Sequence, residues 1–114
     1  METRKMLASY TEDGNTLQLW EAMVDGEKAY ELVSGGVFLM ASYNALSSEW
    51  MVRRAVERCS HPRTLLIGGL GLGYSVREAC RARELERIDV VEIDRQVIDW
   101  NRGLLSEALG AMDD

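Results

Sequence analysis

The sequence is poor in the residues that mark secreted and membrane proteins. It has one proline, one histidine, two cysteines and no apolar run of the ~18 residues that a membrane span requires. The two cysteines, Cys59 and Cys80, are too few for a disulfide framework. The N-terminal residues have mixed charge and no apolar core of signal-peptide length. We therefore expect a cytoplasmic protein with no membrane segment.

Basic charge is also scarce. Lys and Arg number 13 against 19 Asp and Glu, which gives a net charge of −6. A nucleic-acid or anionic-membrane surface needs a cationic patch, so this balance argues against either partner. A run of arginines is interleaved with glutamates and is predicted to be a solvated helix face rather than a phosphate site: Arg77, Arg81, Arg83 and Arg87, with Glu78, Glu84 and Glu86.

The sequence offers little for metal binding or acid–base catalysis. His61 precedes Pro62, and a turn is the better interpretation than a metal or nucleophile site shared with Cys59, because no third ligand stands at a suitable spacing. No metal site is expected. The remaining candidate bases are interpreted as surface residues, so no catalytic residue is assigned: Asp89, Asp99 and Glu107.

Residues 16–42 alternate between apolar and polar side chains, as half-buried strands do. Asp25-Gly26 predicts a hairpin turn because both residues tolerate positive φ, and Gly35-Gly36 predicts another. Residues 1–15 are expected to be a polar, frayed terminus. The pattern predicts a small antiparallel meander within a first domain, residues 1–45.

The second domain is predicted over residues 46–114, where the hydrophobic period changes. A helix should start near Ser47 or Ser48, either of which could be its N-cap, and end before Pro62. Residues 63–69 form a continuous apolar run, which is typical of a parallel strand covered on both faces.

A helix over residues 74–83, a strand over residues 87–93 and a helix capped by Asp94 complete this half. The order is the first β-α-β-α half of a Rossmann-like, doubly wound α/β sheet. The last helix should bury an apolar stripe: Val97, Ile98, Leu105, Ala108 and Leu109.

The glycine-rich segment after the first parallel strand is the main functional signal. Its glycines are Gly68, Gly69, Gly71 and Gly73. Glycine lets a ligand approach the backbone closely and allows the unusual φ values of a strand-to-helix turn. Glu92 ends the next strand, 19 residues after Gly73, where a carboxylate can accept hydrogen bonds from both ribose hydroxyls of a nucleoside.

A nicotinamide dinucleotide is the rival ligand, with the glycine spacing G-x-G-x-x-G. Here the spacing is G-x-G-x-G, followed by Tyr74 instead of a small residue. This fits class I S-adenosylmethionine-dependent methyltransferases better.

The segments "LLIGGLGLGYSVREAC" and "IDVVEIDRQVIDWNRGLL" together resemble the spermidine synthase-like branch of that superfamily. The resemblance spans roughly residues 17–112. It implies that the four glycines line S-adenosylmethionine or its decarboxylated form, that Glu92 holds the ribose and that Ile93 borders the adenine. It also implies an aminopropyl- or methyl-transferring enzyme.

The sequence departs from that family at two sites. Aminopropyltransferases place an aspartate at the position of Gly71, and a tyrosine before the glutamate that corresponds to Glu49. A polyamine is a multiply charged cation that needs several carboxylates, so these departures weaken the case for polyamine specificity.

Two parallel strands alone leave an apolar sheet edge open, which native proteins avoid. The chain could be a fragment of a longer enzyme, could be completed by another polypeptide, or could self-associate. The alternative to an enzyme is thus a non-catalytic family member that forms homo-oligomers through its open sheet edge.

Overall fold

The computed structural model describes residues 3–42 and 45–106. The chain divides into two compact units, residues 1–44 and residues 45–114, and each is described here by itself. That these units are two domains, residues 1–45 and residues 46–114, stays a prediction.

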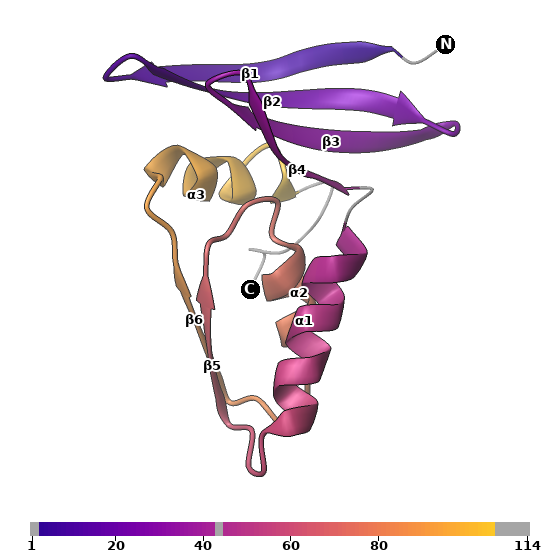
Figure 1. The fold of residues 1–114 in the computed structure, drawn as a ribbon, viewed down its shortest axis with the longest axis vertical. Helices are drawn as coiled ribbons and strands as arrows, with labels where there is room; N and C mark the ends of the chain where they lie inside the picture. Colours follow the sequence, from indigo (N-terminus) through magenta and orange to yellow (C-terminus); the bar gives the residue numbers. More distant parts are fainter. Residues whose placement is uncertain (1–2, 43–44, 107–114) are drawn as a thin grey trace. The chain divides into compact units, whose positions relative to one another are not determined.

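The first unit is an antiparallel sheet in which neighbouring strands along the chain pair with one another (Figure 1). Two-residue turns join the strands, and the residues in the left-handed region are the Asp-Gly and Gly-Gly pairs expected of hairpins. The strands are β1 (Arg4–Glu12), β2 (Asn15–Val24), β3 (Glu27–Ser34) and β4 (Val37–Ala41).

The expectation of a frayed N-terminus is wrong, because residues 4–12 form β1 and pair with β2. The turn between them uses Asp13 at φ 50° and Gly14 at φ 80°, nearly the same values as Asp25 (50°) and Gly26 (81°) in the next hairpin. The same dipeptide therefore makes the same turn twice, and the first occurrence adds a fourth strand.

A polar cluster on one face of this sheet ties β1 to β3 across β2. The Arg4 guanidinium lies over the Trp20 ring, 4.6 Å from its centroid, and its Nε donates to Glu31 Oε1 at 2.9 Å. Glu31 is the partner of Trp20 in the ladder between β2 and β3. The cation–π contact and the ion pair both hold the edge strand β1 in register.

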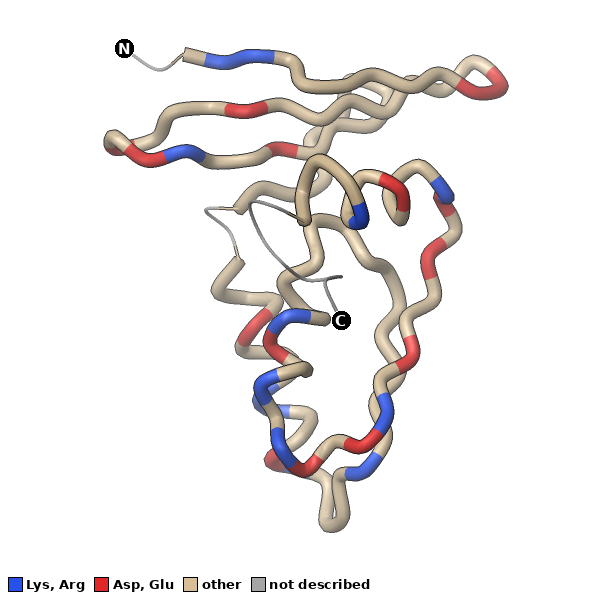
Figure 2. Tube along the Cα trace, turned by 180° about the vertical axis from the view of Figure 1, so that it is seen from behind, with Lys and Arg blue, Asp and Glu red and all other residues tan. Residues whose placement is uncertain are grey.

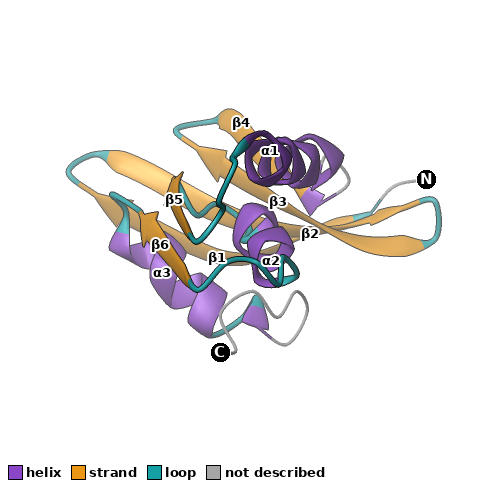
Figure 3. Cartoon of the chain, turned by 90° about the horizontal axis from the view of Figure 1, so that it is seen from below, coloured by secondary structure: helices purple, strands orange, loops and turns teal. Residues whose placement is uncertain are grey.

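The second unit has the predicted β-α-β-α order after a leading helix. The strands β5 and β6 pair in parallel, with Leu65 opposite Ile88 and Ile67 opposite Val90. The helices α1 and α2 lie side by side on one side of this pair (Figure 3). The elements are α1 (Ala45–Arg58), β5 (Thr64–Gly68), α2 (Tyr74–Cys80), β6 (Arg87–Val91) and α3 (Arg95–Arg102). This confirms the predicted fold class.

Helix α1 begins at Ala45, so Ser47 and Ser48 lie inside it and neither is the N-cap that the sequence predicted. Val52 is the buried residue of this helix, whereas Trp50 is exposed. An ion pair between Arg53 Nε and Glu78 Oε1 at 3.4 Å joins α1 to α2.

Strand β5 is covered on one face only, so the prediction of a strand buried on both faces is wrong for the described part of the chain. Ile67 is buried on the side of the helices. Leu66 and Val91 point to the other side and are 69% and 63% exposed. The apolar run is typical of a strand with a covering layer on each face. The described residues leave the face of Leu66 and Val91 exposed.

Helix α3 starts as predicted, with the Asp94 carboxylate accepting from the Gln96 N–H at 2.9 Å. It ends at Arg102 with Gly103 as its C-cap, earlier than the predicted stripe required, although Val97 and Leu105 are both buried. Ala108 and Leu109 of that stripe lie outside the described residues.

Charges of both signs alternate along α1, α2 and the segment leading into β6 (Figure 2). Arg81 pairs with Glu78, and Arg63 with Glu86, both at 3.1 Å. Cys59 and Cys80 are both exposed. Within the described ranges, no group of three or more His, Cys, Asp or Glu side chains could hold a metal, and no helix is long and apolar enough to cross a membrane.

Candidate functional site

The glycine loop, residues 68–73, continues the β5–β6 ladder and then turns sharply into α2. Gly69 N–H donates to the Val91 carbonyl at 2.8 Å, and Gly73 N–H donates to the Leu70 carbonyl at 2.9 Å. Gly69, Gly71 and Gly73 have φ values of 92°, 54° and 84°. A residue with a Cβ rarely adopts such values, so the backbone itself requires glycine at these three positions.

The loop buries its side chains and leaves backbone at the surface. Leu70 and Leu72 are buried, whereas Gly68 and Gly69 are exposed. A Cβ built on Gly68 or Gly69 would meet no atom within 4 Å. Space for a ligand therefore lies directly beside the backbone. The sequence analysis missed that the two leucines anchor the loop.

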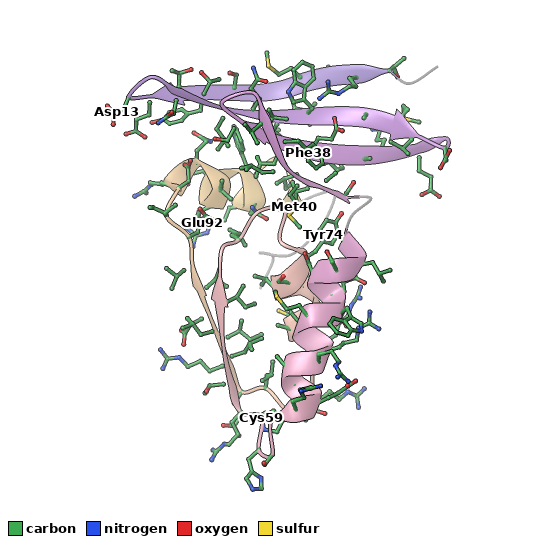
Figure 4. The ribbon with its side chains drawn as sticks, in the orientation of Figure 1. Asp13, Phe38, Met40, Cys59, Tyr74 and Glu92 are labelled. Carbon is green, nitrogen blue, oxygen red and sulfur yellow. The ribbon has the colours of Figure 1, made fainter. Side chains whose placement is uncertain are left out.

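Glu92 follows β6 directly and reaches the glycine loop (Figure 4). Its Oε1 accepts from Leu70 N–H at 2.8 Å, and its Oε2 accepts from Asp94 N–H at 2.9 Å. These two bonds fix the carboxylate between the loop and the start of α3. Each carboxylate oxygen has two lone pairs, so each keeps one acceptor position.

Ile93 lies between Glu92 and Asp94 with its side chain wholly in solvent, at 101% relative exposure. An apolar side chain so placed offers a surface that a flat apolar ring can cover. The structure thus brings Glu92 into hydrogen-bond contact with the glycine loop and leaves Ile93 free beside it.

Asp94, the competing acid, is used as a helix cap. Its Oδ1 accepts from Gln96 N–H, and its own N–H is bonded to Glu92. This supports the assignment of the ligand-facing carboxylate to Glu92.

Asn101 is a residue of this region that the sequence analysis missed. Its Nδ2 donates to the carbonyls of Gly71 and Val97, both at 2.8 Å, from a position that is 1% exposed. The available signal was its spacing: it lies four residues after Val97 and four before Leu105, on the buried stripe of α3. A polar residue on such a stripe needs buried partners.

The arrangement suits binding rather than proton transfer. Asp89 is exposed and accepts from Arg87 Nε at 2.9 Å, and Asp99 is also exposed, as expected of surface residues. Glu107 lies outside the described residues. The exposed backbone of the loop, the Glu92 carboxylate and the exposed Ile93 side chain are the groups of this site that a ligand could contact.

Comparison with known families fits this geometry. The sequence model of the spermine/spermidine synthase domain family matches residues 44–114 of this chain, which include the glycine loop, Glu92 and α3. The chain belongs to the spermine/spermidine synthase family.

Relatives in this family differ in the group that their names say they transfer. The polyamine aminopropyltransferase of Thermococcus onnurineus is 32% identical over 98 residues, covering 86% of this chain and 34% of the relative. The putrescine N-methyltransferase 1 of Nicotiana tabacum is 36% identical over 55 residues, 48% of this chain and 15% of the relative.

Solved structures confirm the fold over nearly the whole chain. Spermidine synthase from Thermotoga maritima superposes with a TM-score of 0.80 at 21% identity, covering 96% of this chain and 37% of that protein. A spermidine synthase in complex with the transition-state analogue AdoDATO gives 0.79 with the same identity and coverage. The chain therefore spans about a third of the length of these relatives, and its fold is the N-terminal part of theirs.

Proposed function

We propose that this chain binds S-adenosylmethionine or its decarboxylated form and contributes the donor-binding part of an aminopropyl- or methyl-transferring enzyme. The observation that carries the proposal is the Glu92 carboxylate, which both Leu70 N–H and Asp94 N–H hold beside the exposed backbone of the glycine loop. Family membership and the nucleoside-type analogue named in a solved relative support it.

The geometry and the resemblance together support the following proposed roles. The backbone of Gly68, Gly69, Gly71 and Gly73 lies against the ligand. The free acceptor positions of Glu92 take the two ribose hydroxyls, because a carboxylate can accept from a vicinal diol with both oxygens. Ile93 borders the adenine and loses its solvent exposure when the ligand binds.

The group transferred is set by residues that accept the second substrate. Gly71 stands where aminopropyltransferases have an aspartate, so the loop lacks one carboxylate for an amine. One relative is named for aminopropyl transfer and another for methyl transfer, so family membership does not decide between the two groups. We propose a cytoplasmic transferase whose acceptor-binding residues come from further polypeptide.

Calorimetric titration with methylthioadenosine tests the proposal. We expect the unmodified chain to bind with a micromolar-range Kd, and Ile93→Ala to weaken binding about fivefold, since losing the buried apolar contact costs roughly 1 kcal/mol. Because Ile93 is wholly exposed, its removal should leave the melting temperature unchanged.

Leu104→Ala is the matched control, because it also truncates an exposed apolar side chain of the second unit. It should leave the affinity unchanged. Absence of binding by the unmodified chain would overturn the proposed function. Equal affinities of Ile93→Ala and the unmodified chain would remove Ile93 from the site.

A second candidate function rests on the bare face of the β5–β6 pair. Leu66 and Val91 expose apolar surface there. A non-catalytic family member could cover this face with a second copy of itself, forming a homo-oligomer. A self-associating chain that binds no nucleoside would favour this function over the first.

A further inference from the structure

We infer that Asn101 is a positioning residue of the nucleoside site: its carboxamide holds the Gly71 carbonyl and so fixes the glycine loop in the conformation that receives the ligand. The inference rests on the proposed function for the identity of that ligand. The contact itself does not depend on the proposed function. It joins a buried side-chain amide of α3 to the glycine loop, 30 residues earlier in the chain.

The orientation of the Asn101 side chain is fixed by chemistry. Its two close neighbours, at 2.8 Å, are the carbonyl oxygens of Gly71 and Val97. Carbonyl oxygens only accept, so the NH₂ group of the amide must face them. An aspartate of the same shape would place an acceptor against two acceptors and could not make either bond.

The remaining atom of the amide argues against stability as the sole role of this residue. Asn101 Oδ1 is buried and has no hydrogen-bond partner within the described residues. A buried acceptor without a donor destabilises a protein, and an apolar side chain of similar shape, such as leucine, avoids that cost. Leucine cannot reproduce the bonds to the Gly71 and Val97 carbonyls, and of these two the bond to Gly71 is the one that reaches the glycine loop.

Glu92 and Asn101 hold consecutive residues of the loop. Glu92 accepts from the N–H of Leu70, and Asn101 donates to the C=O of Gly71, which has φ 54°. Both side chains come from the segment that follows β6. One backbone N–H and one backbone C=O of the loop are therefore held where the loop turns towards α2. These two bonds preorganise the backbone that faces the ligand.

The experiment compares methylthioadenosine affinity with stability in the whole chain. We expect Asn101→Leu to raise the Kd about fivefold, because the loop must be ordered when the ligand binds. Its melting temperature should stay within about 4 °C of the unmodified chain, because removing the unpaired oxygen offsets the lost bonds. Asn101→Ser, which is too short to reach the loop, should weaken binding similarly and is the second variant if the first does not fold.

Val52→Ala is the control for stability. It shortens a buried side chain of α1 and should lower the melting temperature while leaving the Kd within about twofold. If Asn101→Leu and Val52→Ala change the Kd in proportion to their loss of stability, Asn101 is only structural and the inference is overturned.

A measurement without ligand separates this inference from the proposed function. The Leu72 N–H belongs to the same peptide group as the Gly71 carbonyl, so its NMR chemical shift reports the bond to Asn101. Asn101→Leu should change the chemical shift of the Leu72 amide and increase its hydrogen-exchange rate. The chemical shifts of the α1 amides should not change. An unmoved Leu72 resonance would overturn the inference even if the chain binds nucleoside. A moved resonance in a chain that binds none would support the contact and overturn only the proposed function.

Discussion

At the scale of single residues, Gly68 and Gly69 illustrate two different reasons for a glycine in this loop. One is space for a ligand beside the backbone, and the other is a positive φ value. Gly68 lies at the end of β5 outside the left-handed region, and an added Cβ has open space around it. Gly68→Ala should therefore raise the free energy of unfolding by about 0.5–1 kcal/mol, because alanine loses less backbone entropy on folding. The same Cβ would stand in the proposed ligand space and should weaken methylthioadenosine binding, as calorimetry would measure.

Gly69→Ala is the matched control for backbone strain. At φ 92° an L-residue is strained whatever the space, so this variant should lose about 1 kcal/mol or more of unfolding free energy in urea denaturation. If Gly68→Ala is stabilised and binds as tightly as the unmodified chain, the ligand does not lie over Gly68.

Much of the site could be predicted from the sequence at this scale because its signals are local. The G-x-G-x-G spacing predicts unusual φ values in the strand-to-helix turn, and Gly69, Gly71 and Gly73 do have positive φ. Glu92 follows the next strand at the expected place. The Asn101 contact could not be predicted in the same way, since it depends on how α3 packs against the loop.

At the scale of elements, the start of α3 distinguishes two neighbouring acids. Asp94→Ala removes the acceptor of Gln96 N–H and should cost about 1 kcal/mol of unfolding free energy, because a helix N-cap is lost. The Asp94 N–H that binds Glu92 is backbone and persists. We therefore expect methylthioadenosine affinity to change less than twofold.

The control for this prediction is Asp94→Asn, which keeps a capping oxygen and should unfold close to the unmodified chain. Urea denaturation and calorimetry on both variants give the comparison. A large loss of affinity in Asp94→Asn with stability retained would assign the ribose carboxylate to Asp94 instead of Glu92.

The elements that the sequence predicted correctly are those with a strong repeating pattern or a cap. Alternation predicts β2 to β4 and the cap predicts the start of α3, while a continuous apolar run predicts β5 and β-branched residues predict β6. Strand β1 was missed because its residues are mostly polar and exposed, so periodicity gave no signal. The Asp13-Gly14 turn was the available signal, since the identical dipeptide at Asp25 had already been taken as a hairpin.

At the scale of the whole chain, the sequence predicted the fold class but misjudged how much of it is covered. A continuous apolar strand is typical of a sheet with helices on both faces, and β5 has this composition. In the described residues α1 and α2 cover one face, while Leu66 and Val91 remain exposed on the other. A strand of this composition is expected to have a covering layer on its second face as well.

This bare face gives the last prediction, which concerns a homo-oligomer that uses the face of the β5–β6 pair instead of the open sheet edge expected from the sequence. Leu66 and Val91 lie on the same face, because Leu66 pairs with Asp89 and Val91 follows two residues later. If a second copy covers them, sedimentation should show a concentration-dependent dimer that Leu66→Lys converts to monomer, since a buried unpaired charge is costly. Met51→Lys, on an exposed apolar residue of α1, should leave the dimer intact. A monomer at every concentration, unfolding cooperatively, would contradict self-association and leave completion by further polypeptide as the way this face is covered.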